Sequence, residues 1–446
     1  MSKRPLNAFV LAGVLIAMAA PDAPGAFDIV TSGSVYPSHA ADGDWRVVSG
    51  GGSDAELYVG MSGAGRVDVT NGATLTTPKR VHMGYMTGAT GVINVNGSAW
   101  VAEDHVGLGD ARWTDANVTV TDGTWSVADS CYIGAHSDAN GTVNLHDQAV
   151  WTSQDYVHVG HYGAGVVNVD SNASWISQER VNVGFFSDSS GRVNLSGGNW
   201  TSQGTTQIGY DYSGVGGQVY VNAGSTLTCA GSLNLTDISE IVLDGGTLHL
   251  AGGAELAGEF RANAGGGTVQ IEIGSADPNS DLCLIGESVN LAGCAMEVLF
   301  EPGFTPGRSD VFSLFAPIGE ADLPAILGAA ASIAVPADWE LDPNTGVLTC
   351  LLDPVQPDTN DDGVVDALDY IALKTHIGQG SDMSTADGDC DGDCDVDWYD
   401  LQILQDYYGQ PIPETQTIPE PGAAILLMFG AAGLLCRRFI ASRLRR

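Results

Sequence analysis

A repeat of about 25 residues constrains the fold of this chain more than any other feature, because a fixed period of this size indicates a stacked-repeat architecture. From residue 54 to about 250, an apolar residue followed by Gly recurs once per repeat, and a Trp or Leu follows later in each repeat. The marker glycines are Gly60, Gly84, Gly109, Gly134, Gly160, Gly184 and Gly209.

Between the markers, apolar residues alternate with polar ones, as in the pairs Val67 and Val69 or Val167 and Val169. That is the period of a strand with one buried face. One unit cannot bury its apolar face alone, but stacked neighbours can. The predicted fold class is therefore mostly β, a parallel β-solenoid (β-helix) with one repeat per coil. With strands about 4.8 Å apart, eight coils would form a rod of roughly 40 Å.

A column of tryptophans is expected at one point of the coil. The second markers are Leu75, Trp100, Trp125, Trp151, Trp175, Trp200, Leu227 and, more loosely, Leu248. Two interpretations compete: an internal aromatic stack that sets the register of the coils, and an external platform on which sugars stack. We favour the internal stack, because the column becomes Leu at both ends and Leu suits packing better than ligand contact.

The array over residues 54–250 resembles the repeat shared by autotransporter passenger regions and PEP-CTERM proteins. The apolar-Gly markers, the Gly-x-Val-x-Val runs and the Trp after a turn carry the resemblance. It implies a β-helical fold, an extracellular setting and no catalytic activity. His82 and His158 each lie two residues before a marker Gly, and we interpret this repeated position as a tolerated surface position rather than a ligand.

Three regions flank the array. Residues 1–26 are typical of a secretory signal peptide, because Lys3 and Arg4 precede an apolar run too short to span a membrane comfortably, with small-residue cleavage sites near its end. Residues 27–53 are expected to form an N-terminal cap, since exposed end coils need covering. Residues 251–352 lose the period and are expected to form a β-rich capping region.

The composition changes abruptly after residue 352. The whole chain has a formal net charge of −37, which excludes a general nucleic-acid binder, since that function needs a basic face. Between Asp353 and Asp400 there are 14 Asp, against a single Lys or Arg, Lys374. Unpaired carboxylates at this density repel one another, so a bound cation is the physical solution.

The spacing of these residues predicts two calcium loops within residues 353–410. Each loop has ligands at positions 1, 3, 5, 7, 9 and 12 of an EF-hand-like loop, and the pattern that begins at Asp358 begins again at Asp389. The predicted ligands are Asp358, Asn360, Asp362, Val364 (through its backbone carbonyl), Asp366 and Asp369, then Asp389, Asp391, Asp393, Asp395, Asp397 and Asp400.

A segment with apolar residues on one helical face follows each loop. Two loop–helix units with Asp at position 12 resemble a type I dockerin module, which implies two Ca²⁺ ions and a cohesin-like partner. Two features depart from the family pattern. Cys394 replaces the Gly expected at position 6 of the second loop. Positions 10 and 11 are Ala367-Leu368 and Trp398-Tyr399, where dockerins of cellulose-degrading complexes typically carry small hydroxyl residues.

Cysteine pairing stays open at this stage. An exported chain with eight Cys is a candidate for disulfides, and spacing alone does not fix which residues pair. Cys283 with Cys294, and Cys390 with Cys394, are the two candidate bridges.

The C-terminal segment resembles a second targeting signal, in addition to the signal peptide. Residues 411–421 form a Pro-containing linker, and Pro419, Glu420 and Pro421 precede an apolar run and an Arg-rich tail. A transmembrane helix is expected over residues 422–440. Residues 419–446 resemble the PEP-CTERM sorting signal. The resemblance implies export in a Gram-negative bacterium, transient insertion in the inner membrane, and cleavage by an exosortase-type enzyme.

Two functions compete on these grounds. The first, which we favour, is a non-enzymatic structural, adhesion or matrix protein, exported and sorted to the cell surface or extracellular matrix. The second is an enzyme or accessory protein of polysaccharide breakdown, either a β-helix lyase or a cohesin-docked carbohydrate binder. The candidate partners are the exosortase-type enzyme, a cohesin-like protein and a surface polysaccharide.

Overall fold

The fold is described from a computed structural model of the 446-residue chain. The described residues are 28–48, 54–170, 172–186, 188–210, 216–274, 282–304, 306, 311–337, 339–350, 357–360, 362–380, 383–390 and 395–409. The chain divides into two compact units, residues 1–351 and residues 352–446. The predicted signal peptide, the linker at residues 411–421, the sorting signal and the transmembrane segment lie outside the described residues.

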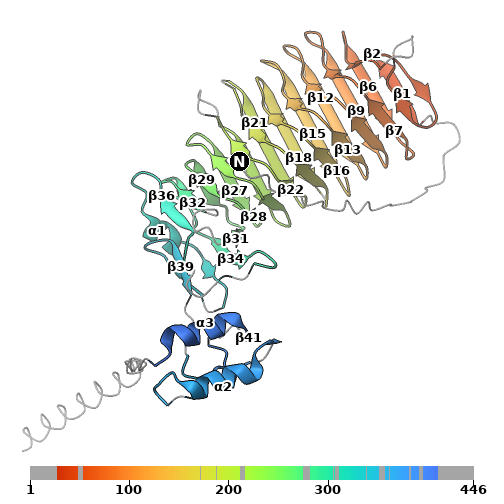
Figure 1. Cartoon of the computed structure of the whole chain (residues 1–446). Coiled ribbons are helices and arrows are strands. Elements are labelled where there is room, and N and C mark those ends of the chain that lie inside the picture. The colour runs from red at the N-terminus through yellow and green to blue at the C-terminus, as the bar shows by residue number, and fades with distance from the viewer. Residues whose placement is uncertain are drawn as a thin grey trace, which may run out of the picture. The chain divides into compact units, whose positions relative to one another are not determined.

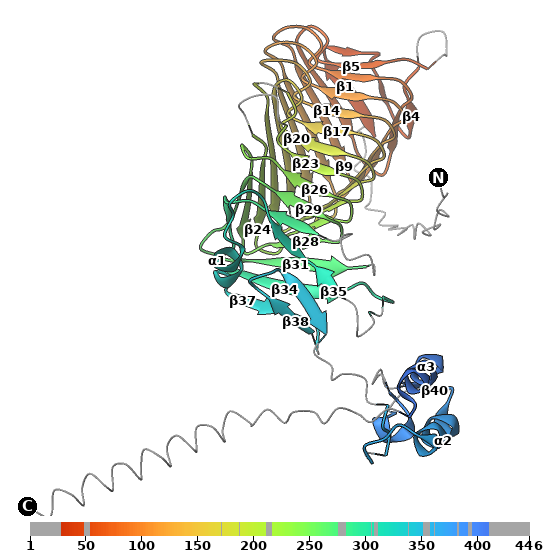
Figure 2. The ribbon, with the colours of Figure 1, turned by 60° about the vertical axis from the view of Figure 1, so that its left-hand side comes forward.

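The first unit is built from three twelve-stranded sheets, here called sheets A, B and C (Figures 1 and 2). Each coil contributes one strand to each sheet, and equivalent strands of successive coils pair in parallel. This confirms the predicted mostly β class and the parallel β-solenoid.

The strands of sheet A, in spatial order, are β3 (Ala40–Ala41), β1 (Ile29–Gly33), β6 (Ala64–Val69), β9 (Thr90–Asn96), β12 (Asp115–Thr121), β15 (Asn140–His146), β18 (Ala164–Asp170), β21 (Ser190–Ser196), β24 (Gln218–Asn222), β27 (Glu240–Asp244), β30 (Glu259–Ala262) and β33 (Val289–Asn290). The strands of sheet B are β2 (Val35–Tyr36), β5 (Leu57–Val59), β8 (Val81–Met83), β11 (Val106–Leu108), β14 (Cys131–Ile133), β17 (Val157–Val159), β20 (Val181–Val183), β23 (Thr206–Ile208), β26 (Leu233–Leu235), β29 (Ala254–Leu256), β32 (Cys283–Ile285) and β36 (Phe315–Pro317). The strands of sheet C are β4 (Trp45–Arg46), β7 (Thr74–Thr77), β10 (Ala99–Ala102), β13 (Thr124–Val127), β16 (Val150–Ser153), β19 (Ser174–Ser177), β22 (Asn199–Ser202), β25 (Thr226–Cys229), β28 (Thr247–Leu250), β31 (Gly267–Ile273), β34 (Cys294–Phe300) and β37 (Ser332–Ala334).

The tryptophans form one continuous stack inside the solenoid. Trp100, Trp125, Trp151, Trp175 and Trp200 pair in register across sheet C and are at most 1% exposed. Successive ring centroids lie 4.4–4.9 Å apart, with interplanar angles of 7–10°. The internal interpretation is confirmed, and the external sugar platform is wrong for this column, because a buried ring offers no face to a ligand.

The marker glycines turn the chain sharply after each strand of sheet B. Gly160 has a φ of +74°, and a Cβ there would lie 2.3 Å from the carbonyl oxygen of Ser190 in the next coil. A side chain would therefore clash with the neighbouring coil as well as strain the backbone. A glycine therefore recurs in every repeat because a side chain at this position would prevent close stacking of the coils.

Both ends of the solenoid are covered. At the N-terminal end, β1 and β2 run antiparallel to β6 and β5, whereas β4 pairs in parallel with β7. The three sheets continue past residue 250 through β29 to β34, although the sequence period fades there. Beyond them lie the short helix α1 (Leu323–Gly328) and a three-stranded antiparallel sheet of β35 (Val311–Ser313), β39 (Val347–Cys350) and β38 (Trp339–Asp342).

The predicted Cys283–Cys294 bridge is wrong. Both residues are buried free thiols, and they belong to β32 of sheet B and β34 of sheet C. Cys131 and Cys229 are also buried free thiols. Burial raises the pKa of the Cys283 thiol to about 12 and of the Cys294 thiol to about 11, so these groups behave as small apolar core residues.

The second unit is helical. It contains α2 (Ala367–His376), the 3-10 helix η1 (Thr385–Asp387) and α3 (Trp398–Tyr407), with a two-stranded antiparallel sheet of β40 (Gln379–Gly380) and β41 (Asp395–Val396). No helix in the part of the chain that the structure describes is both long and apolar enough to span a membrane.

Candidate metal centre

The two helices of the second unit begin in the same way. Asp366 caps α2 and Asp397 caps α3, and each forms a capping box with the Asp three residues later, Asp369 or Asp400. The Asp366 side chain accepts a hydrogen bond from the amide of Leu368, and the carboxylate of Asp369 accepts one from the amide of Asp366. Positions 9 and 12 of each predicted loop are therefore fixed by the start of a helix.

The first predicted loop folds back on itself through its carboxylates. Asp369 is fully buried, and its Oδ1 accepts hydrogen bonds from the backbone amides of Thr359 (2.7 Å) and Asn360 (3.3 Å). Asp358 is 4% exposed and accepts from the amides of Asp362 (3.2 Å) and Gly363 (2.6 Å). The structure thus joins position 12 to positions 2 and 3, and position 1 to positions 5 and 6.

The turn of this loop needs Gly363, whose φ is +88°. The side chains of Asn360 and Asp362 accept hydrogen bonds from the amides of Asp362 and Val364, respectively. Both side chains remain exposed, as does Val364. The loop therefore carries two buried carboxylates and a more open edge.

The described parts of the second loop repeat this arrangement. Asp389 and Asp400 are 3% and 1% exposed, and Asp400 accepts hydrogen bonds from the amides of Cys390 and Asp397, both at 2.7 Å. Asp391, Asp393 and Cys394 lie outside the described residues, as does the side chain of Asp395. The candidate Cys390–Cys394 bridge and the effect of Cys394 on the turn therefore remain predictions.

The buried core shows the same duplication. The residues of this core are Val365, Leu373, Cys390, Val396 and Leu404. Val365 and Val396 each stand directly before a capping Asp, and Leu373 and Leu404 occupy the same place in α2 and α3. The two halves of the unit therefore pack through matching residues, as a tandem duplication requires.

The donor chemistry of the loops fits calcium. Carboxylate, amide and carbonyl oxygens are the ligands that calcium prefers, and two nearly buried carboxylates per loop need a compensating charge. In the first loop, Asp358, Asn360, Asp362, Asp366 and Asp369 with the Val364 carbonyl would hold the ion. In the described residues these carboxylates accept hydrogen bonds from backbone amides, and no three of these Asp residues bring one oxygen each within 4.8 Å of one another.

Large apolar side chains are exposed in the first turn of each helix, beside the capping boxes. Leu368 on α2 is 58% exposed, and Trp398 and Tyr399 on α3 are 74% and 69% exposed. These residues occupy positions 10 and 11 of the two loops. Trp398 and Tyr399 are neighbours in the sequence, and aromatic residues are enriched at protein interfaces.

Residues 356–409 match the dockerin type I domain model. The matched segment covers both loops and both helices, so we call it the dockerin module. Type I dockerin domains typically bind calcium, in agreement with the donor set of the loops. A search of curated proteins and a search of solved structures each found no match to the chain.

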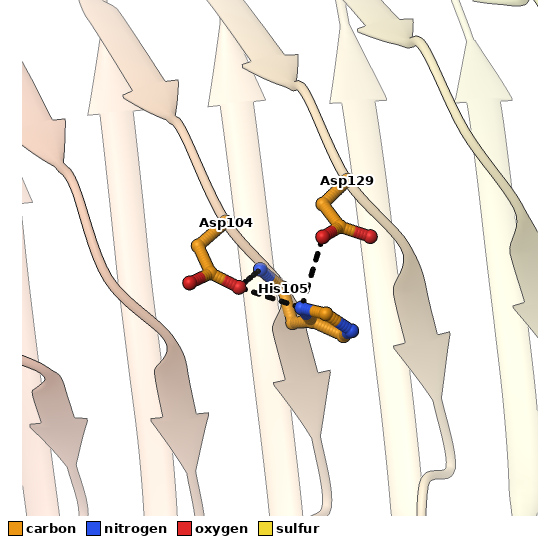
Figure 3. Close-up of side chains that lie close together, drawn as sticks. All are labelled: Asp104, His105 and Asp129. Carbon is orange, nitrogen blue, oxygen red and sulfur yellow. Dashed lines mark hydrogen bonds and ion pairs between the residues drawn. The ribbon is translucent and has the colours of Figure 1, made fainter.

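A second cluster of metal-type side chains lies on the solenoid, where the sequence predicted no ligand cluster (Figure 3). His105 Nδ1 lies 2.6 Å from Asp104 Oδ1 and 3.3 Å from Asp129 Oδ2 of the next coil. Burial raises the pKa of the Asp104 carboxyl, but hydrogen bonds from the ring and amide of His105 outweigh it and lower the pKa overall. The three side chains are half-buried, and we interpret them as an ion pair that ties two coils together.

The surface interpretation of His158 is wrong. His158 is only 8% exposed, because the rings of Tyr132, His161 and Phe185 pack around it. Burial, and then the positive charges of His161 and Arg180, lower the pKa of His158 to about 3. The equivalent residue three coils earlier, His82, is half-buried and bonds to Asp110. A count of aromatic residues beside the marker glycines would have signalled this cluster.

Proposed function

We propose that this protein is an exported, non-enzymatic solenoid protein that a calcium-stabilised dockerin module attaches to a cohesin-like receptor. The observation that carries this proposal is the duplicated module, with twin Asp capping boxes, a twofold core and a dockerin-type match over both halves. Such modules act by attachment, so the solenoid would be the cargo or spacer that is attached.

The exposed apolar side chains at positions 10 and 11 are the proposed receptor contact. Leu368, Trp398 and Tyr399 would bury their apolar surface against the receptor, and interface energy concentrates in such aromatic anchors. Since small hydroxyl residues are absent from these positions, the receptor should present an apolar surface rather than a polar one.

The test is calcium-dependent binding of the whole chain to a panel of purified cohesin domains, followed by surface plasmon resonance. We expect micromolar or tighter binding to at least one domain in calcium and none in chelator. Trp398→Ala should weaken it at least tenfold, whereas Trp113→Ala, which removes an exposed ring from the solenoid, should not. No binding to any cohesin in calcium would contradict the proposal.

The non-enzymatic part has its own test. Incubation with uronate polysaccharides should give no unsaturated product. Appreciable turnover that is lost on mutating an acidic cluster of the solenoid would favour the lyase alternative.

The sorting signal at residues 419–446 is the proposed route to the surface. We expect the mature protein in the surface or matrix fraction, with a C-terminus near Pro419, Glu420 or Pro421. Mass spectrometry of the C-terminal peptide from each cell fraction measures this. A mature chain that still ends at Arg446 and remains in the inner membrane would contradict processing.

A further inference from the structure

Sheet B carries a column of aromatic side chains on its outer face. In strand register, the middle residue of each strand from β5 to β17 lies beside its equivalent in the next coil. The residues of this column, from the N-terminal end, are Tyr36, Tyr58, His82, Gly107, Tyr132 and His158. Gly107 is thus the one position of this column that has no ring.

The rings on either side of Gly107 are already stacked on their far faces. Tyr58 and His82 have centroids 4.9 Å apart at 16°, and Tyr132 and His158 have centroids 5.3 Å apart at 9°. His82 and Tyr132 are two coils apart, which at about 4.8 Å per coil leaves roughly 9.6 Å between their levels. This space is partly filled: the His105 ring stacks on Tyr132, with centroids 6.1 Å apart at 16°, and the Asp110 carboxylate lies over Gly107.

A second column is interrupted at the same level. It consists of the residue after each marker glycine: Met61, Tyr85, Asp110, Ala135, His161, Phe185 and Tyr210. Rings stand on both sides of the interruption, with Tyr85 packed against His82 and His161 packed against Tyr132. In the coil of Gly107 neither column has a ring, because Asp110 follows the same strand; the second column also lacks a ring at Ala135, in the next coil.

The surface beside Gly107 is hollowed into a cavity of about 280 Å³. Its lining includes His82 and Tyr132 at either end, Gly107 between them, and the polar residues Arg80, His105 and Asp110. The Asp110 carboxylate lies over Gly107, where an added Cβ would be 3.2 Å from its Oδ1, and it bonds to His82 Nδ1. This cavity therefore offers two ring ends together with a carboxylate acceptor and cationic or imidazole donors.

We propose that this cavity binds one sugar ring of a neutral polysaccharide. A pyranose presents polarised C–H groups on its faces, which suit the negative face of an aromatic ring, and hydroxyls at its rim. Each hydroxyl both donates and accepts hydrogen bonds, which Asp110 can accept and Arg80 or His105 can donate. The volume is near the lower end of ligand pockets and therefore suits one ring.

Charge selects the class of polysaccharide. Asp104, Asp110, Asp129 and Glu56 lie in or beside the hollow, and the whole chain carries a net charge of −37. An acidic polymer such as a polyuronate would be repelled. A cationic ligand is disfavoured because Asp110 already bonds to His82 and Arg80 lines the same cavity. The exposed rings of Tyr85 and Tyr36 extend the apolar face beyond the cavity, where neighbouring sugars of a chain would lie.

The test is affinity electrophoresis and isothermal titration of the whole chain with soluble xyloglucan, galactomannan, hydroxyethylcellulose and soluble starch, against alginate and polylysine. We expect saturable binding to at least one neutral polymer. Gly107→Tyr should abolish it by completing the column, and Tyr132→Ala should weaken it about tenfold or more. Gln207→Tyr is the matched control, because Gln207 occupies the same register position three coils further on from Tyr132 and should tolerate a ring without loss of binding.

Several results would overturn the proposal. Binding that survives Gly107→Tyr would place the sugar elsewhere on the chain. Binding to alginate or polylysine alone would show that the cavity selects charge, and no binding to any neutral polymer would remove the basis for a sugar site. Equal thermal unfolding of the Gly107→Tyr, Tyr132→Ala and Gln207→Tyr proteins checks that lost binding is not lost folding. The Trp398→Ala chain should bind the sugar unchanged, which separates this proposal from the cohesin proposal.

Discussion

The solenoid and the dockerin module are both made of repeated units, but they stabilise the repeat by different means. In the solenoid each coil buries a nearly continuous apolar face against the next, and the Trp stack runs through five consecutive coils. In the module two units share a core of five buried residues, while four carboxylates are nearly buried beside them. The first arrangement is stabilised by apolar burial, and we expect the second to need a bound cation as well.

The difference shows how the number of repeats decides whether apolar burial alone can stabilise a fold. Many stacked coils bury enough apolar surface to offset the conformational entropy of ordering the chain. Two short loop–helix units bury far less, so we expect metal binding by their polar ligands to contribute to folding. Four predictions test this contrast.

Removing calcium should have the largest effect and should be confined to the dockerin module. With two sites at a calcium concentration 100-fold above Kd, binding contributes about 5 kcal/mol to folding. We expect chelation to remove the helical circular dichroism of residues 357–409 and to expose them to protease, while the solenoid fragment persists. Unchanged helical signal in chelator would show that the module folds without the ion.

Trp151→Ala should destabilise the solenoid by about 3–5 kcal/mol, because it opens a cavity in the middle of the stack. The measurement is urea unfolding of the whole chain in calcium, followed by tryptophan fluorescence. Trp113→Ala is the matched control, since Trp113 is 65% exposed and its loss should cost less than about 0.5 kcal/mol. Equal losses for the two variants would mean that the stack does not stabilise the fold.

Mild acid should lower the stability of the solenoid. The pKa of His158 is lowered to about 3 in the folded state, so between pH 6.5 and 3 the unfolded chain binds the extra proton and stability falls as pH falls. Between pH 6.5 and 4.5 the loss should be about 2–3 kcal/mol, since one proton contributes about 1.4 kcal/mol per pH unit.

His158→Asn isolates this effect. Asn182 occupies the equivalent position in the next coil, so Asn is compatible with the site. We expect the unfolding midpoint of this variant to change much less from pH 6.5 to 4.5 than that of the original chain. A variant with the same pH dependence would assign the effect to other groups.

Thr77→Val should have the smallest effect, about 1 kcal/mol, since it removes the hydroxyl that accepts the indole hydrogen bond of Trp100 at 3.1 Å. The indole nitrogens of Trp125 and Trp151 are buried with no hydrogen-bond partner among the described residues, so the stack already tolerates this loss. The same urea experiment measures it. A cost above that of Trp151→Ala would mean that hydrogen bonds rather than packing hold the column.

The sequence predicted the parts of this protein that repeat. The marker glycines and the tryptophans predict each successive coil, because every coil needs a tight turn and a large buried side chain. Asp369 and Asp400 predict two helix starts, because each completes a capping box. The sequence did not predict that the coils continue through β29 to β34. Backbone pairing continues there after the side-chain markers that reveal the period have gone.

What the sequence determined by itself is the inner face of the solenoid and the ligand chemistry of the loops, since alternation and spacing set both. Only the tertiary structure decided the outer face. His82, Gly107 and Tyr132 are separated by one repeat each along the chain, and the sequence between them does not indicate that they are neighbours in space. Parallel register places them on three adjacent strands and turns a missing side chain into a cavity between two rings. A single glycine in the sequence does not predict a cavity until its neighbours across the sheet are known.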